Sequence, residues 1–245
     1  MRSTRRRRPR SWPTTAAMPL TFRQVCALRS TGPAQQPSRG TDMRILDIEQ
    51  GSQAWYAARL GVPTASEFGS IITPKKGEYA AAADTYINQL IDELMRPEAA
   101  ESFGGNRHTL RGKELEPDAR EYYAFEQDVV PQQVGFILND AGTLGCSPDS
   151  LIGADGGLEI KCPDGPTHVK WVRAGGIPDE HKPQVHGSLI ITGRAWWDFL
   201  SYCPGYEPLL VRVTPDGFTE KLQGHLDRFV REYHAARAKF LPGVA

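Results

Sequence analysis

The spacing of apolar and polar residues separates an unpatterned N-terminal stretch from a long patterned remainder. Residues 1–42 show no sustained helical or strand period, whereas apolar residues beyond them recur at the intervals typical of helices and strands. The pattern predicts helices over 80–96, 109–127, 167–175, 178–192 and about 218–240, and strands over 129–138, 195–202 and 209–213. This mixture predicts an α/β (α+β) fold, with a central mixed β-sheet flanked by helices.

Two short apolar runs in the middle of the patterned region predict a β-hairpin. Residues 149–152 and 158–162 flank a glycine- and aspartate-rich turn over 153–157. Alternate side chains of a strand share a face, so Glu159 and Lys161 point to the same side while Ile160 enters the core. The hairpin therefore brings Asp149, Glu159 and Lys161 to one place.

Two converging carboxylates form an oxygen-rich site that suits Mg²⁺ or Mn²⁺ better than zinc. A neighbouring lysine can position an attacking water and offset developing negative charge during phosphoryl transfer. The sequence Pro148-Asp149 followed by Glu159-Ile160-Lys161 is the PD…(D/E)xK pattern of a large nuclease superfamily. The plainer interpretation is an exposed hairpin that carries a Glu/Lys pair.

The charges of the chain are unevenly distributed. Residues 1–42 hold nine arginines and one acid, which leaves 20 basic and 28 acidic residues in 43–245. An acidic body cannot bind DNA through bulk charge, so phosphate contacts require a local basic patch or metal ions. We interpret residues 1–42 as a disordered extension, either a nucleic-acid arm, a targeting signal or an over-extended start before Met43, and we favour the over-extended start. Residues 43–245 form the expected domain, and no apolar run predicts a membrane partner.

The four cysteines, Cys26, Cys146, Cys162 and Cys203, form no CxxC pair. We expect reduced, buried thiols and no iron–sulfur cluster, with Cys146 and Cys162 as candidate neighbours across the hairpin.

Polar residues outside the hairpin are weaker candidates. Arg59 precedes a predicted helix start that Thr64 or Ser66 would cap, and together these residues could form a phosphate pocket. The sequence alone favours the plainer interpretation, a surface arginine with ordinary caps. Glu116 either forms a surface pair with Arg120 or projects toward the hairpin as a third carboxylate. Gln184 lies one turn into a helix and could bond a phosphate of the strand to be cut, whereas His186 is interpreted as a packing or DNA-edge residue.

Five motifs occur in a characteristic order between Ile45 and Val213: WYAARLGVPTASEFGSII, RGKELEPDAREYY, LGCSPDSLI, GLEIKCP and PQVHGSLIITG before an aromatic strand. In this order the chain resembles the bacteriophage lambda exonuclease family, also called YqaJ-type viral recombinases. The resemblance implies a restriction-endonuclease-like PD-(D/E)xK core. Ser150 and Arg111 depart from the family pattern outside the charged set, and residues 164–177 match poorly.

The resemblance implies a role for each matched residue. Asp149, Glu159 and Glu116 would supply metal-site carboxylates, the backbone carbonyl of Ile160 a further ligand, and Lys161 the catalytic lysine. The family glutamine corresponds to Gln184. The residues expected at the 5′-phosphate and DNA are Arg59, Ser66, Ser147, Trp55 and Thr64.

The resemblance also implies an activity. These enzymes are metal-dependent exodeoxyribonucleases that degrade one strand of double-stranded DNA processively from 5′ to 3′, leaving 3′ single-stranded overhangs for phage-type homologous recombination. The expected cofactor is Mg²⁺, with two ions and Mn²⁺ as a substitute. The expected assembly is a homotrimer in the cytoplasm of a bacterial host, encoded by a phage or prophage, which passes its product to a single-strand annealing protein.

Two alternative functions stay open at this point. One is a structure-selective or endonucleolytic PD-(D/E)xK repair nuclease, which would nick supercoiled plasmid. The other is a non-catalytic DNA-binding protein. The intact Asp149, Glu159 and Lys161 set argues against the second alternative, because buried like charges cost free energy unless a metal offsets them.

Overall fold

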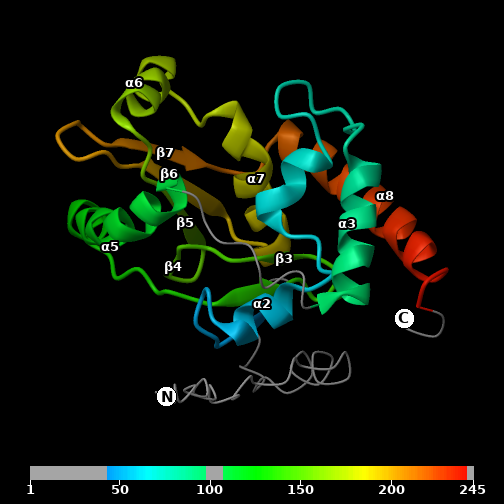
Figure 1. The fold of residues 1–245 in the computed structure, drawn as a ribbon. Helices are drawn as coiled ribbons and strands as arrows, with labels where there is room; N and C mark the ends of the chain where they lie inside the picture. The colour runs from blue at the N-terminus through cyan, green and yellow to red at the C-terminus, as the bar shows by residue number, and fades with distance from the viewer. Residues whose placement is uncertain (1–42, 98–106, 242–245) are drawn as a thin grey trace, which may run out of the picture.

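The computed structural model describes residues 43–97 and 107–241, in which helices surround two small β-sheets (Figure 1). The expectations for residues 1–42, and for Cys26 within them, lie outside the described residues. Across the two described ranges, no helix combines the length and the apolar character needed to cross a membrane.

The larger sheet contains the predicted hairpin. Its strands lie in the order β4 (Ser150–Ile152), β5 (Gly156–Lys161), β6 (Trp196–Ser201) and β7 (Leu209–Val213). The β4/β5 and β6/β7 pairs are antiparallel and the β5/β6 pair is parallel. The predicted mixed sheet and the α/β class are therefore confirmed.

A second sheet of three antiparallel strands lies beside the first. It consists of β1 (Arg44–Leu46), β2 (Phe136–Leu138) and β3 (Gly145–Cys146). The strand predicted over 129–138 is wrong for most of its length, because only its last three residues form a strand. Asp128 has a positive φ of 51° and Pro131 lacks an N–H, so the chain cannot pair continuously there.

Six helices account for most of the remaining described chain. They are α2 (Gln53–Arg59), α3 (Ala83–Met95), α5 (Arg107–Gln127), α6 (Gly165–Ala174), α7 (Lys182–Thr192) and α8 (Gly217–Arg237). Two short 3₁₀ helices, η1 (Ala65–Ser70) and η2 (Asp179–His181), precede α3 and α7. The helix predicted over 178–192 is thus split into η2 and α7.

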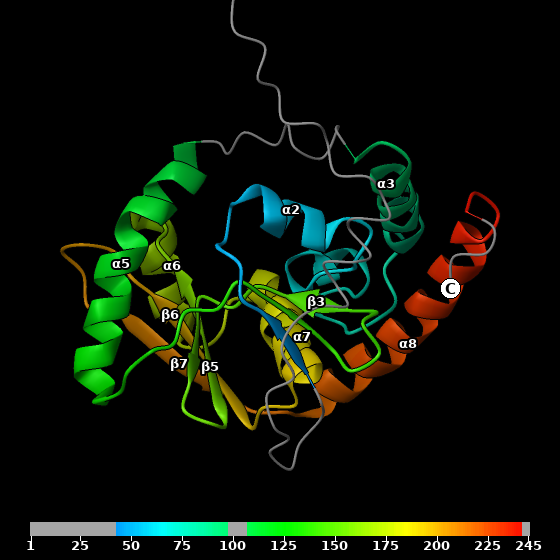
Figure 2. The same ribbon diagram turned by 90° about the horizontal axis from the view of Figure 1, so that it is seen from below.

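The helices enclose the sheets from several sides. In both views α5 lies on one flank of the molecule, and α3 and α8 lie on the opposite flank (Figures 1 and 2). Helix α7 runs through the interior and is buried on nearly all sides. Gly187 permits this position, because a Cβ atom there would come within 2.4 Å of the Phe68 ring on η1.

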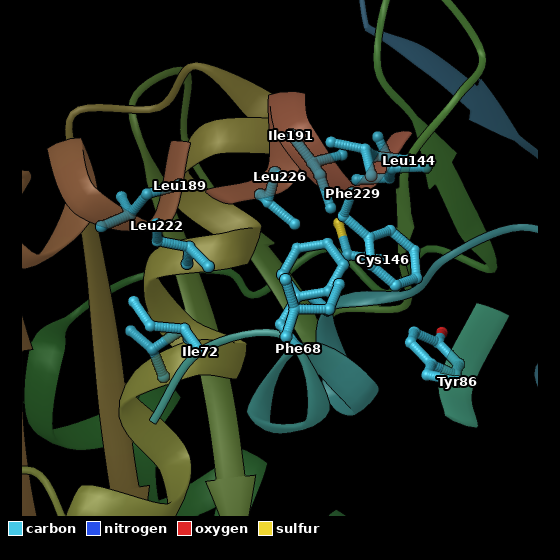
Figure 3. Packing of buried hydrophobic residues seen from close by; sticks show 14 of the residues in the cluster. Phe68, Ile72, Tyr86, Leu144, Cys146, Leu189, Ile191, Leu222, Leu226 and Phe229 are labelled. Atoms are coloured by element: carbon cyan, nitrogen blue, oxygen red, sulfur yellow. The ribbon is translucent and has the colours of Figure 1, made fainter. Parts of the chain in front are cut away.

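The main hydrophobic core joins η1, α3, α7 and α8. Phe68, Ile72, Leu189, Leu222 and Phe229 meet in its centre, each at most 2% exposed (Figure 3). Each such side chain contributes roughly 1.5–3 kcal/mol when it leaves water. This core fixes α7 against the sheets, and α7 carries Gln184.

A smaller apolar cluster lies between α5 and the four-stranded sheet. It contains Ala119 and Tyr123 from the helix and Leu158, Ile160 and Leu200 from the strands. Ile160 is 6% exposed, as the alternation of the motif strand predicts. Helix α5 is thereby held over the strand that carries Glu159 and Lys161.

Candidate active site

The β4–β5 hairpin places Asp149 beside the motif strand. Ser150 pairs with Leu158 in the antiparallel register, so the preceding residue, Asp149, lies opposite Glu159. The Asp149 Oδ2 atom accepts a hydrogen bond of 2.5 Å from the Ile160 backbone N–H. Asp149 and Glu159 are thus brought together by local strand pairing.

Glu159 is the centre of the polar contacts on this face. Its Oε1 atom accepts hydrogen bonds from Lys161 Nζ and from Gln184 Nε2, each of 2.6 Å. The Glu159 side chain is 4% exposed and the Lys161 side chain 29%. Gln184 lies in the first turn of α7, so its hydrogen bond to Glu159 joins the β5 motif to a helix that begins about twenty residues later.

Burial and like charge dominate the electrostatics of this group. Burial raises the pKa of Asp149 well above its ordinary value, and the Glu159 charge raises it further, against the opposing effect of Lys161. For Lys161, burial alone would lower the pKa, but the charges of Glu159 and Asp149 outweigh it and raise the pKa. The two carboxylates therefore favour a nearby positive charge.

Glu116 reaches the hairpin through Arg120. The two side chains form an ion pair one helical turn apart on α5. Arg120 also donates from Nε to Ser150 Oγ at 3.1 Å and from Nη2 to the Asp149 carbonyl oxygen at 3.4 Å. The expected local pair is therefore present, and Arg120 links it to the hairpin, while the role of Glu116 as a third metal-site carboxylate stays a prediction.

The donor set at this site fits a hard divalent cation. Asp149, Glu159 and the Ile160 carbonyl supply oxygen atoms. Loss of solvent disfavours the charged form of Asp149, and a bound cation would stabilise that charged form. Glu116 is engaged by Arg120, and within residues 43–97 and 107–241 no three His, Cys, Asp or Glu side chains are gathered in a ready metal-binding cluster. We therefore keep the four-ligand set as a prediction.

A second polar pocket is built around Arg59 at the end of α2. Its guanidinium stacks over the Trp55 ring at 4.3 Å, donates to Ser147 Oγ at 3.3 Å, and donates to Thr64 Oγ1 at 3.3 Å and Ser66 Oγ at 3.5 Å. Trp55 Nε1 also donates to Ser147 Oγ at 2.9 Å. The structure brings together all five residues predicted at the 5′-phosphate. Burial lowers the pKa of Arg59.

The Arg59 pocket and the carboxylates are linked by a short segment of chain. Ser147 binds Arg59, and only Pro148 separates Ser147 from Asp149. Gln50 secures this segment, since its Nε2 atom donates to the Pro148 carbonyl at 2.9 Å and to the Val134 carbonyl at 2.8 Å. An anion held at Arg59 would therefore lie at a fixed position relative to the carboxylates.

Comparison with known proteins agrees with this arrangement. The YqaJ-like viral recombinase domain matches residues 54–195, which include both polar sites. The chain belongs to this family. A search of curated proteins found no significant match.

Solved structures also resemble this YqaJ-like chain. An alkaline exonuclease (LHK-Exo) from Laribacter hongkongensis is 30% identical, with a TM-score of 0.67 over 77% of this chain and 96% of the other. The same enzyme in complex with dAMP gives the same figures. A phage-related exonuclease from Haemophilus somnus 129PT, 12% identical, shares the fold with a TM-score of 0.57 over 73% of this chain and 96% of its own.

Two sequence-based expectations about this YqaJ-like domain need correction. Thr64 stands before η1 but makes no side-chain cap; its N–H instead donates to Tyr86 Oη at 3.1 Å and its hydroxyl accepts from Arg59. Cys146 and Cys162 are free thiols that pack in different apolar clusters, Cys146 in the main core and Cys162 against the smaller cluster. Cys146 is buried beside Ser188, and Cys162 lies near Cys203 at the ends of β5 and β6.

Some residues of the site carried no signal in the sequence. Gln50 lies in an irregular stretch, and Arg120 was recognisable only as the partner of Glu116. His186 packs as expected, because it is 3% exposed and its Nδ1 atom lies 2.8 Å from Thr219 Oγ1 at the start of α8.

A cavity of about 410 Å³ lies away from both polar sites, between the β2–β3 loop, the end of α7 and α8. None of the predicted site residues lines this cavity, so it is separate from the carboxylate site and the Arg59 pocket.

Proposed function

We propose that the chain is a metal-dependent exonuclease that removes nucleotides from the 5′ strand at the ends of double-stranded DNA. The family match and the similarity to alkaline exonucleases support exodeoxyribonuclease activity. The complex of the Laribacter enzyme with dAMP, a deoxynucleotide, supports DNA as the substrate class.

One observation carries the proposed direction of digestion. The Arg59 pocket is joined through Ser147 and Pro148 to Asp149, so the anion-binding group and the carboxylates share one rigid segment. A terminal 5′-phosphate bound by Arg59 would accept charge-assisted hydrogen bonds and hold the first linkage over the carboxylates. A strand that enters by its 3′ end offers no such phosphate.

The chain's own residues divide the work of hydrolysis. Asp149, Glu159, the Ile160 carbonyl and Glu116 would hold Mg²⁺, with Mn²⁺ as a substitute and two ions in all. The cations would supply charge stabilisation for an in-line attack on the phosphodiester. Lys161 and Gln184, which both bond to Glu159, would orient the attacking water and the phosphate.

The acidic body calls for a way to remain on DNA other than bulk charge. We propose a ring-shaped homotrimer that encloses the duplex, because topological closure permits processive digestion without a large basic surface. The 3′ single-stranded product would then pass to a single-strand annealing protein, as in phage-type recombination.

The test is digestion of a linear duplex that carries a 5′-phosphate and a distinct label on each end, with Mg²⁺. Progressive loss of the 5′ label with survival of the 3′-ended strand is expected, and Lys161→Ala should slow it by ~10²–10⁴-fold. The matched control is Lys170→Ala, which removes an exposed lysine from α6 and should leave the rate unchanged.

Three results would count against the proposal. Equal digestion of 5′-hydroxyl and 5′-phosphate ends would remove the role of Arg59. Nicking of supercoiled plasmid at a comparable rate would favour an endonuclease. The absence of Mg²⁺-dependent label loss would exclude exonuclease activity on this duplex.

A further inference from the structure

A buried carboxylate on β6 accepts hydrogen bonds from two neighbouring elements, α5 and β7. Asp198 is fully buried, and its Oδ2 atom accepts a hydrogen bond of 2.7 Å from Tyr123 Oη on α5. Arg212 on β7 donates from Nε to Oδ1 and from Nη2 to Oδ2, each at 2.8 Å. The Arg212 guanidinium also stacks over the Trp196 ring at 3.7 Å.

The surroundings of Asp198 make a carboxylate costly there. The side chains between α5 and the sheet form the smaller apolar cluster, which includes Ala119, Leu158 and Leu200. A charge buried among apolar groups costs free energy, and its ion pair often only offsets that cost. Because apolar residues of similar size often stabilise a fold equally well, these directional bonds contribute little net stability, and their distinctive contribution is orientation.

The hydrogen bonds to Asp198 fix the orientation of α5, which apolar packing alone does not determine. Burial of apolar area is non-directional, and a helix on an apolar surface can rotate or slide with little loss. Glu116 lies two helical turns before Tyr123, and Arg120 lies between them, so all three share a side of α5. The Tyr123 bond therefore sets the rotation and height at which Glu116 and Arg120 face the β4–β5 hairpin.

We propose that Asp198, held by Tyr123 and Arg212, is a positioning residue for the nuclease site. It acts through α5, by keeping Arg120 on Ser150 and the Asp149 carbonyl, and Glu116 beside Arg120. This inference rests on the proposed function, because the position of Glu116 matters only if Glu116 helps to hold the cation.

Asp198→Asn is the primary test variant, since it keeps the size of the side chain and removes its charge. The Mg²⁺ concentration for half-maximal digestion should rise about tenfold, with the maximal rate largely restored at high Mg²⁺. Calorimetric titration with Mn²⁺ should show a matching rise in Kd. Binding of a 5′-phosphorylated duplex without metal should change less than twofold, because Arg59 bonds to Ser147, Thr64 and Ser66, and Gln50 rather than α5 holds the adjoining Pro148.

The chain contains a control carboxylate at the surface that has the same kinds of hydrogen-bond partner. Glu232 on α8 accepts hydrogen bonds from Tyr79 Oη at 2.6 Å and Arg228 Nε at 2.8 Å, and Arg228 stacks over the Tyr79 ring at 3.9 Å. The Arg228 and Glu232 side chains are exposed on α8, which lies on the opposite flank of the molecule from α5 (Figures 1 and 2). Glu232→Gln should leave the Mg²⁺ requirement and the Mn²⁺ Kd unchanged.

The outcomes separate the inference from the proposed function. Wild-type metal affinity in Asp198→Asn, or an equal rise in Glu232→Gln, would overturn the inference. If Asp198→Asn does not fold, Tyr123→Phe, which keeps the packing, should show the same shift at smaller size, and its absence would also overturn the inference. An inactive wild type would refute the proposed function, while the Mn²⁺ titration would still decide the role of Asp198.

Discussion

At the scale of single residues, the carboxylates proposed to bind metal on the hairpin carry a cost in stability. Asp149 is half-buried opposite Glu159, and loss of solvent together with the Glu159 charge raises its pKa. The unfolded chain therefore releases the Asp149 proton at a lower pH than the folded chain does. The free energy of unfolding accordingly falls as pH rises from the ordinary carboxylate range to the raised pKa.

Replacing this carboxylate should reveal the cost. Without divalent metal at neutral pH, Asp149→Asn should unfold at a higher temperature by roughly 2–4 °C for each ~1 kcal/mol gained, while digestion is lost. The variant should also lack the fall in stability with pH. Calorimetric scans in chelator between pH 4 and 8 measure both effects, with the exposed Asp140→Asn as control. A lower unfolding temperature for Asp149→Asn at neutral pH would contradict this account.

The Arg59 guanidinium makes contacts that an ammonium cannot reproduce. It stacks on Trp55 while its two terminal nitrogens reach hydroxyls on different segments. Arg59→Lys should therefore reduce the rate ratio between 5′-phosphate and 5′-hydroxyl ends by ~10-fold or more, through KM. The rate on 5′-hydroxyl ends should stay near that of the wild type. A retained preference in this variant would show that the phosphate is recognised elsewhere.

At the scale of secondary structure, Arg194 holds the turn of the motif hairpin. Its Nη1 atom donates to the carbonyls of Gly156 at 2.7 Å and Gly153 at 2.9 Å, with a longer contact to Ile152. Arg194 follows Gly193, the C-cap of α7, so the end of that helix is fastened to the β4–β5 turn. The helix that begins near Gln184 and the hairpin that carries Glu159 are thus joined at both ends.

Removing this fastening should weaken both stability and activity. Arg194→Met leaves the turn carbonyls without the guanidinium and should lower the free energy of unfolding by about 1–3 kcal/mol. Urea denaturation measures the loss, and the digestion rate should fall with it. Arg173→Met, at an exposed position on α6, is the control and should change neither quantity. Equal stability of the two variants would rule out this role for Arg194.

Local pattern predicted the elements that depend on neighbours in the chain. The hairpin, the strand over 209–213 and helices α3 and α8 follow from alternation and helical spacing. The strand predicted over 129–138 failed because Asp128 and Pro131 break the pairing, which apolar content does not reveal. Thr64 failed as a cap because its hydroxyl, the group that would accept a helix N–H, lies against the Arg59 guanidinium instead.

The candidate site was predictable to the extent that it is a local motif. Asp149, Glu159 and Lys161 lie within thirteen residues on one hairpin, and the Arg59 pocket was recognised through the family resemblance. Asp198 and Arg194 were not, because their roles come from the parallel β5/β6 register and from contacts across the sheet. No spacing in the chain encodes such contacts.

At the scale of the whole molecule, the arginine-rich segment and the acidic domain should be separable. A chain that starts at Met43 should keep its unfolding temperature and its digestion rate at saturating DNA. It should lose non-specific DNA affinity at low salt, since up to eight net positive charges are removed. Fluorescence anisotropy over a salt series, beside thermal scans, measures these changes. A large loss of stability would show that residues 1–42 belong to the domain.

The parallel pairing of β5 with β6 has a consequence for the order of folding. The β4–β5 hairpin closes through a three-residue turn, whereas β6 can join only after the entire crossover from Cys162 to Ala195 has been laid down. Short loops close sooner and at lower entropic cost than long ones. Asp149 and Glu159 are therefore expected to meet early, while water still surrounds them, and to lose that water only when the crossover helices dock. The repulsion between the two carboxylates would then oppose the late docking of the crossover helices. A divalent cation would offset that repulsion and accelerate this step.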